Sequence, residues 1–428
     1  MLSKVLALIV PLLLIADVSN AQNSGTERSI SAEDYASRLH GFWLGQSIAN
    51  WTGLVTEMDR VQPPFYTDED WGALDQPSIW GSFVGHSSRI DFYLPDADRV
   101  WGADDDTDIE YMYWHLVDVS DTATLSSVQI RQGWLRHIYS NEDAPISSVE
   151  FRRENFLWVS NERAYYLMKD QALLPPATSD PAVNPDHAMI DAQLTTESFG
   201  LMAPGLPEVA LELARLPISV TASGEAAAIA RFYVVMHALA IDIDRSGDVG
   251  GQLRKIAAQA ATQLPESGYA HDMYQFVLQH YLTNPDKDDW EFTRDAVFER
   301  YQQQGSAGYG YQRPFDAGIN FAASLVSLFY GEGNYKRTIQ IAALAGWDSD
   351  NPAATWGGLL GFILGVDALE AVFGHSFPDS YWIHRTRRGF PDRMPGLDGE
   401  DSFPLMAARG VNVVNKVLLQ HGRPLLVE

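Results

Sequence analysis

The chain has 428 residues, of which 46% are hydrophobic and 11% aromatic, so its composition excludes a wholly disordered protein. It contains no cysteine, which excludes disulfides, thiolate metal sites and cysteine nucleophiles. The formal net charge of −26 disfavours nucleic acid and anionic membranes as partners and favours the accumulation of cations.

The first 21 residues have the pattern of a secretory signal peptide. Lys4 is followed by the apolar segment 5–16, and Ser19 and Ala21 are the small residues expected before a cleavage site. The apolar segment is too short to span a bilayer. We therefore expect cleavage after Ala21 and a soluble, monomeric mature protein, 22–428, without membrane insertion. Its location would be periplasmic or secreted, which suits the absence of cysteine.

The first helix of the mature chain is expected to begin after Ser31, which has the position of an N-cap, and to end near residue 49. In it Gly41 and Gly45 lie four residues apart and would let another backbone approach closely. The segment 59–100 is rich in Pro, Gly, Asp and Trp, and it predicts a long loop with short helical pieces.

Helical spacing of apolar residues dominates the rest of the chain, beginning with a helix predicted from Thr107. Alternating strand patterns are scarce, although a small hairpin in an insertion is compatible with the sequence. We therefore expect one all-α domain with long inserted loops. The further helices are predicted at about 124–139, 155–169, 205–215, 224–241, 249–263, 268–282, 288–303, 316–330, 334–345, 352–372 and 405–420.

Four aspartates occur within the five residues 104–108, where the helix from Thr107 begins. Free N–H groups and the helix dipole favour carboxylates at a helix N-terminus, which would account for one or two of them. Four carboxylates repel one another unless a cation lies between them. Hard cations such as Mg²⁺ and Ca²⁺ prefer these oxygen ligands.

A second acidic segment, Asp348 and Asp350, precedes a helix for which Asn351 is a suitable N-cap and Pro352 a suitable first residue. This helix contains Gly357, Gly358, Gly361 and Gly365. Each glycine inside a helix costs about 1 kcal/mol relative to alanine, so close packing is the expected compensation. We expect these glycines to pack against the helix that carries the first acidic segment.

Three other charged segments are weaker signals. Glu57 follows a glycine turn in the segment 50–57, and a glutamate in that position is by itself typical of a surface. The segment 242–253 begins like a calcium-binding loop but has Leu253 where a bidentate glutamate is expected, so we interpret it as a solvated turn. A basic cluster would either be a solvated turn or offset the acidic charge near an anionic substrate: His384, Arg385, Arg387 and Arg388.

The acidic segments, in this order, resemble the ADP-ribosylglycohydrolase family. That family shows a G-D-x-x-G-x-x-x-E segment, a T-D-D-T motif that opens a helix, and a late G-G-D-T-D-T motif that opens a Gly/Ala-rich helix. The counterparts here are 50–57, 104–107 and 346–351, and the segment 335–342 resembles the family's approach to the last motif. The likeness extends over roughly residues 35–370.

The resemblance implies an orthogonal all-helical bundle that holds two Mg²⁺ ions, for which Mn²⁺ or Ca²⁺ would also fit. It implies a sugar or nucleotide-sugar as the small-molecule substrate. Glu57 matches the family's glutamate near the metals. Glu197, in a segment similar to that of larger and often exported relatives, is a second candidate for acid–base catalysis. The implied metal ligands are Asp105, Asp106, Thr107, Asp348, Asp350 and Asn351, with Asp104 as a further candidate.

The sequence also departs from the family pattern. Asn50 replaces the first aspartate, Asp104 replaces the leading threonine of the second motif, and Asn351 replaces the last threonine of the third. Trp347 replaces a glycine, which puts a bulky ring where the backbone usually passes. A Thr-His pair that is frequent after the family's central motif has its counterpart in 220–222 without the histidine, so we expect a diverged substrate pocket.

Three functional hypotheses remain after these comparisons of motifs. The first is a metal-dependent glycohydrolase that cleaves an ADP-ribosyl or related furanosyl bond, with Glu57 or Glu197 as the base. The second is a non-catalytic metal- or sugar-binding protein on the same scaffold. The third is a helical glycosidase that uses two carboxylates and no metal, and whose activity would survive EDTA.

Overall fold

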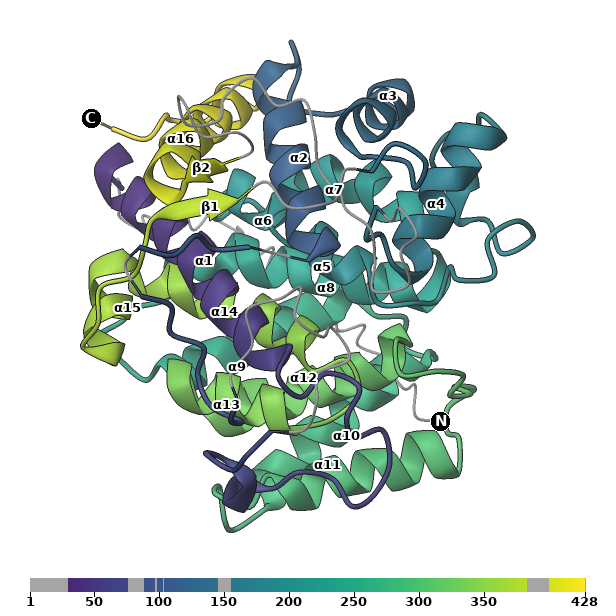
Figure 1. Ribbon diagram of the computed structural model, residues 1–428, viewed down its shortest axis with the longest axis vertical. Helices are drawn as coiled ribbons and strands as arrows, with labels where there is room; N and C mark the ends of the chain where they lie inside the picture. Colours follow the sequence, from purple (N-terminus) through teal and green to yellow (C-terminus); the bar gives the residue numbers. More distant parts are fainter. Residues whose placement is uncertain are drawn as a thin grey trace, which may run out of the picture.

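In a computed structural model of the protein, nearly all regular structure is helical, as predicted (Figure 1). The residues described are 30–75, 88–96, 98–102, 104–144, 155–382 and 400–427. The predicted signal peptide and the basic cluster around Arg385 lie outside them. Short 3₁₀ or π segments join several helices: η1 (Asp68–Asp70), η2 (Ala177–Ser179), η3 (Ala240–Asp242), η4 (Ala261–Gln263) and η5 (Phe298–Gln303).

The α-helices follow the predicted order, with two additional short helices, α5 and α6, in the middle of the chain. Their bounds are α1 (Ala32–Gly53), α2 (Asp105–Val119), α3 (Ser127–His137), α4 (Val159–Asp170), α5 (Ala192–Thr195), α6 (Phe199–Met202), α7 (Pro207–Thr221), α8 (Gly224–Leu239), α9 (Val249–Ala260), α10 (Tyr269–Thr283), α11 (Glu291–Val297), α12 (Ala317–Gly331), α13 (Tyr335–Leu344), α14 (Asp350–Leu364), α15 (Val366–Phe373) and α16 (Phe403–Gln420).

Two acidic helix starts differ from the predicted boundaries. The helix α2 begins at Asp105 rather than Thr107, because the Asp104 carboxylate caps it by accepting the Thr107 N–H at 3.0 Å. The helix α14 begins at Asp350, so the prediction that Asn351 is its N-cap is wrong. Asp105 and Asp106 therefore lie in the first turn of α2, and Asp350 lies in that of α14, where backbone N–H groups favour negative charge.

The predicted helix 352–372 is two helices. The chain bends by 112° between α14 and α15. The bend lies at Gly365, whose φ of +74° is a conformation that glycine adopts without strain. A small antiparallel pair, β1 (Ser380–Trp382) with β2 (Glu400–Ser402), matches the hairpin that the sequence left open.

The centre of the fold is the close packing of α1 against α14, which cross the middle of Figure 1. A Cβ added to Gly45 would lie 2.4 Å from the Gly357 carbonyl oxygen, and one added to Gly41 would lie 2.3 Å from that of Gly361. The expectation that the α14 glycines face α2 is therefore wrong. They face α1, because glycines four residues apart on both helices form matching grooves.

We predict that Gly45→Ala destabilises the protein by about 2 kcal/mol, because the new methyl group would have to displace the backbone of α14. Urea unfolding monitored by circular dichroism measures the effect. Gly310→Ala is the matched control, since a Cβ there meets nothing within 4 Å. Equal stability of the two variants would show that α1 and α14 can separate without cost.

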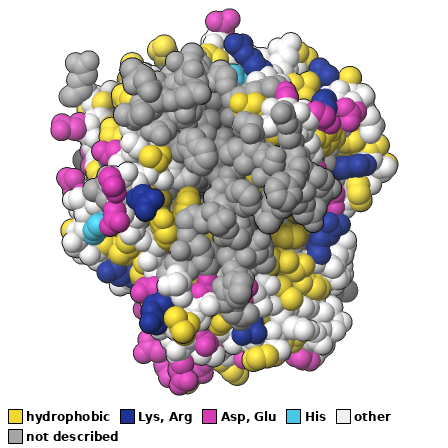
Figure 2. Space-filling model, in the orientation of Figure 1, with side chains coloured by type: hydrophobic (Ala, Val, Ile, Leu, Met, Phe, Trp, Pro, Cys, Tyr) yellow, Lys and Arg dark blue, Asp and Glu magenta, His cyan; other side chains and the backbone are white. Residues whose placement is uncertain are grey.

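The core continues through α8 and α12, which are buried along most of their length. The segment Gly224–Asp242 is long and apolar enough to cross a membrane, and 78% of its most apolar 18-residue window is buried inside the protein, as in a core helix. On the described part of the surface, acidic side chains gather at the lower edge of the face seen in Figure 2. The negative charge therefore lies partly on the surface and partly, as shown next, in a cavity.

Candidate metal centre

A cavity of about 290 Å³ lies where the end of α1 meets the beginnings of α2, α4 and α14. Seven of its twelve lining residues are carboxylates, although most of the exposed wall is apolar. The carboxylates are Glu57, Asp104, Asp105, Asp106, Asp191, Asp348 and Asp350, and the other lining residues are Trp158, Val159, Ile190, Phe315 and Asn351.

Glu57, Asp348 and Asp350 form the first carboxylate group. One oxygen of each lies within 4.8 Å of those of the other two, and all three side chains are buried. Gly53 makes this possible, because a Cβ there would lie 2.3 Å from the Asp350 Cα. The end of α1 therefore lies directly against the beginning of α14.

The turn that carries Glu57 is held by hydrogen bonds to the segment before α14. The Thr56 hydroxyl lies 3.1 Å from that of Ser349 and also bonds the Ala343 carbonyl. The Met58 N–H donates to the Trp347 carbonyl at 2.9 Å. A glutamate that sequence alone places on a surface is thus fixed in the interior beside two aspartates.

Asp105, Asp106 and Asp191 form the second group, again with one oxygen of each within 4.8 Å of the others. The Asn161 amide donates to Asp105 Oδ2 and to Asp106 Oδ1, both at 2.9 Å. The Ser160 hydroxyl and the Asn161 backbone N–H donate to Asp191. The beginning of α4 therefore orients all three carboxylates from outside the cavity, as outer hydrogen bonds do around metal ligands.

Three residues of this centre were not singled out by the sequence: Asp191, Asn161 and Trp158. Asp191 stands alone after a proline-rich loop, without a neighbouring acid or a motif, so no local signal marks it. Its backbone position is set at long range, since the adjacent Ile190 N–H donates to the Phe315 carbonyl at 3.0 Å.

The donor set fits hard divalent cations. Asp348 Oδ1, Asp350 Oδ1 and Asn351 Oδ1 are buried without a hydrogen-bond partner among the described residues. Carboxylate and amide oxygens are the ligands that Mg²⁺ and Ca²⁺ prefer. A cation would compensate both the unpartnered oxygens and the repulsion between the carboxylates.

Burial controls the protonation of the metal-free centre. It raises the pKa of Asp191 to about 6 and that of Asp348 to about 7. Burial also raises the pKa of Asp350 well above its ordinary range, and the charges of Glu57 and Asp348 add to the effect. The pKa of Asp105 is also raised well above its ordinary range, by burial and then by the charges of Asp104 and Asp191.

We predict that the free energy of unfolding of the metal-free protein falls as the pH rises through about 6 and about 7, the pKa values of Asp191 and Asp348. The folded protein binds these protons more tightly than the unfolded chain, so its advantage is lost on deprotonation, by at most about 1.4 kcal/mol per group and pH unit.

Urea unfolding in EDTA and in Mg²⁺ across this interval measures the slope. Mg²⁺ should reduce it, because bound cations replace the protons. Stability in EDTA that rises over the same interval would contradict the prediction.

A model of the ADP-ribosylglycohydrolase family matches residues 31–398. The chain belongs to the ADP-ribosylglycohydrolase family. No curated protein matches it. A solved structure described as an ADP-ribosylglycohydrolase-related protein complex has 16% sequence identity and a TM-score of 0.46, and the match covers 79% of this chain and 90% of the other. The fold assignment therefore rests on the family match and on the helices themselves.

Two departures from the ADP-ribosylglycohydrolase motifs are in contact. The Asn50 amide donates to the Asp104 carboxylate and, at 3.2 Å, to Asp350 Oδ2. The family pattern has the carboxylate at the position of Asn50 and a neutral threonine at that of Asp104. The negative charge has thus moved across the contact, and the number of carboxylates is unchanged.

Trp347, another departure, keeps its ring out of the cavity. Its φ of +58° is the left-handed conformation that explains the glycine found here in the family. The fully buried ring packs 5.0 Å from that of Phe65, and its N–H donates to Gln302 at 2.7 Å. The bulky side chain therefore does not obstruct the metal centre.

Two predicted site residues are not among those lining the cavity. Thr107 is buried in the first turn of α2, where its backbone N–H bonds Asp104. Glu197 is fully buried between α5 and α6, where burial and then the charge of Glu110 raise its pKa well above the ordinary range. The roles assigned to both stay predictions.

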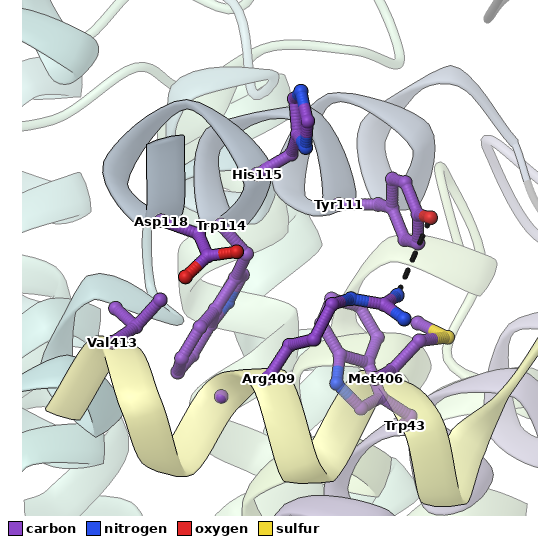
Figure 3. A pocket seen from close by; sticks show the side chains of 9 residues that line it. Trp43, Tyr111, Trp114, His115, Asp118, Met406, Arg409 and Val413 are labelled. Atoms are coloured by element: carbon purple, nitrogen blue, oxygen red, sulfur yellow. Dashed lines mark hydrogen bonds between the residues drawn. The ribbon is translucent and has the colours of Figure 1, made fainter. Parts of the chain in front are cut away.

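A second crevice, between α2 and α16, is too small for an organic substrate (Figure 3). Its volume of about 20 Å³ would hold about one water molecule. Trp43 and Trp114 lie along it, and Arg409 donates to the Tyr111 hydroxyl at 3.4 Å. The carboxylate cavity is therefore the better candidate for an active site.

Proposed function

We propose that the protein is an exported, Mg²⁺-dependent glycohydrolase that cleaves an ADP-ribosyl or related furanosyl bond at a dinuclear metal site. The observation that supports it is the arrangement of two groups of three buried carboxylates around one cavity. Family membership supports the glycohydrolase class. The N-terminal sequence pattern supports export.

Each carboxylate group would hold one ion: Glu57, Asp348 and Asp350 the first, and Asp105, Asp106 and Asp191 the second. Mg²⁺ fits such oxygen ligands, and Mn²⁺ or Ca²⁺ would fit them too. When bound, a pair of such ions would supply Lewis acidity and would lower the pKa of a bound water molecule toward neutral pH.

The apolar part of the cavity would orient the substrate. Trp158, which is 38% exposed, and Phe315 lie on the same cavity as the carboxylates. Flat rings of this kind pack against a base or a sugar face and keep bulk water away from the bond to be broken. Phosphate groups of a nucleotide-sugar would have to point away from the carboxylates.

Glu57 is the carboxylate to which we assign proton transfer. It lies at the end of α1, in the first group, and the turn that carries it is fixed by Thr56 and Met58. From there it would accept a proton from attacking water or stabilise positive charge on the sugar ring. Glu197 lies outside the cavity wall, so a catalytic role for it would have to be exerted through other groups.

Hydrolysis assays of the mature protein test the proposal. The panel comprises ADP-ribosyl-arginine, ADP-ribosyl-serine, nucleosides and pentofuranosides, each with Mg²⁺ and with EDTA. Cleavage that needs the metal would support the proposal and identify the substrate class. Cleavage that survives EDTA would favour a metal-free glycosidase.

Metal-dependent binding of the same compounds without turnover would instead favour a non-catalytic binding protein. The replacement of Asp by Asn at position 50 is the observation that motivates this alternative. N-terminal sequencing of protein secreted by the producing cell tests export, and a sequence that began at Met1 would refute cleavage.

A further inference from the structure

A second cavity, of about 450 Å³, lies between α7, α8 and the loop around η2. It shares no lining residue with the carboxylate cavity. Its lining contains two arginines, three serines and one acidic residue. The lining residues are Pro176, Ser179, Asp180, Arg215, Ile218, Ser219, Ala222, Ser223, Ala227 and Arg231.

Two helix faces form this cavity. Its α7 residues begin at Arg215 and recur at helical spacing, and its α8 residues do so up to Arg231. The two helices are joined by Ala222 and Ser223, so the arginines project from neighbouring antiparallel faces. Ser179 closes the third side.

Neither arginine has a hydrogen bond or an ion pair within the part of the chain that the structure describes. This is unexpected in a protein with 56 acidic and 30 basic residues. Arg231 is more than half buried, and that burial lowers its pKa, whereas the charge of Glu225 raises it. A buried guanidinium is stabilised by an anion that accepts its N–H groups.

The beginning of α8 borders the cavity, since Ser223 and Ala227 are among the lining residues. Its N-cap is Ser223, which makes no side-chain capping bond, because its hydroxyl lies 3.0 Å from the His187 ring. The N–H groups of the first turn of this 16-residue helix thus have no side-chain cap. The acidic lining residue, Asp180, accepts the Ala182 N–H at 2.9 Å.

We infer that this cavity binds a phosphate group, held by Arg215 and Arg231 with the N-terminus of α8. A guanidinium group can donate two parallel hydrogen bonds to two oxygens of one phosphate, and helix N-termini favour anions. The phosphate would be either the inorganic ion or the phosphoryl end of an organic monoester. The site is independent of the metal centre, so the inference does not rest on the proposed glycohydrolase activity.

Isothermal titration calorimetry of the full mature protein tests the site, with inorganic phosphate and ribose 5-phosphate as separate probes. EDTA is present throughout, so that phosphate cannot bind through metal ions in the carboxylate cavity. The variants are Arg231→Gln and Arg215→Gln. Arg136→Gln is the matched control, because Arg136 is exposed on α3 and its substitution removes the same positive charge.

We expect both probes to bind, and each cavity variant to weaken binding by about tenfold or more, as loss of a charge-assisted bond predicts. The control should change the dissociation constant by less than about twofold. Tighter binding of ribose 5-phosphate would support an organic phosphate as the ligand, and equal binding would support the inorganic ion.

Thermal unfolding of each variant verifies that it is folded. If Arg231→Gln does not fold, the Arg215→Gln variant still tests the site, because Arg215 is exposed. Absence of binding to the unmodified protein up to about 10 mM would overturn the inference. So would binding that Arg215→Gln and the control weaken equally.

Discussion

Asp350→Asn is expected to lower metal-dependent hydrolysis by about 10³-fold or more. Asp350 belongs to the first carboxylate group, and its Oδ1 is buried without a partner among the described residues. An amide at this position removes a negative charge and one anionic ligand. Metal ions contribute several kcal/mol to stabilising charge in a transition state, which corresponds to this loss of rate.

The same substitution is expected to stabilise the metal-free protein. Burial, and then the charges of Glu57 and Asp348, raise the pKa of Asp350 because they disfavour its ionised form. A neutral amide avoids that cost. Unfolding in EDTA and hydrolysis in Mg²⁺ should therefore change in opposite directions. That combination distinguishes a ligand from a residue needed only for folding.

Asp170→Asn is the matched control for this experiment, since Asp170 is exposed at the end of α4. It should leave both hydrolysis and stability nearly unchanged. Full activity of Asp350→Asn would refute the metal site as we assign it. Lost activity together with lost stability in EDTA would indicate a purely structural role.

The second large effect is expected from Asn50→Asp, which should destabilise the metal-free protein by about 3 kcal/mol. The Asn50 amide donates to both Asp104 and Asp350. An aspartate would replace that donor by a third carboxylate in a buried place. Chemical unfolding in EDTA measures the loss.

The compensating change is Asp104→Thr, which reproduces the family pattern at both positions. Thr can still cap α2, so the helix start is kept. We expect the double variant to recover at least half of the stability lost by Asn50→Asp, with a favourable coupling in a double-mutant cycle. Additive effects would mean that the two departures are unrelated.

Much of the fold was predictable from local patterns. The helix that begins at the aspartates near Thr107 and the glycine-rich helix near Asp350 both occur, and each begins two residues before its predicted start. Helix starts depend on neighbours within one turn, and sequence displays those neighbours directly. The glycines at 41 and 45 also signalled a close backbone approach, which the structure confirms.

The partner of each glycine face could not be predicted, because packing depends on how whole helices fit together. The α14 glycines were assigned to the wrong helix for this reason. Trp347 likewise looked obstructive in the sequence, but a left-handed backbone conformation turns its ring toward Phe65. Neither feature leaves a signal within a few residues of its position.

The sequence by itself determined the helical class, the family and the acidic segments, since local periodicity and motifs carry all three. Tertiary structure alone decided which carboxylates meet. Glu57 joins Asp348 and Asp350 because Gly53 admits the end of α1 against α14, and Asp191 joins Asp105 and Asp106 because α4 orients both sides. The physical reason is that carboxylates far apart in the sequence act on one another only when they are close in space. Only the folded protein brings them close enough to bind a cation.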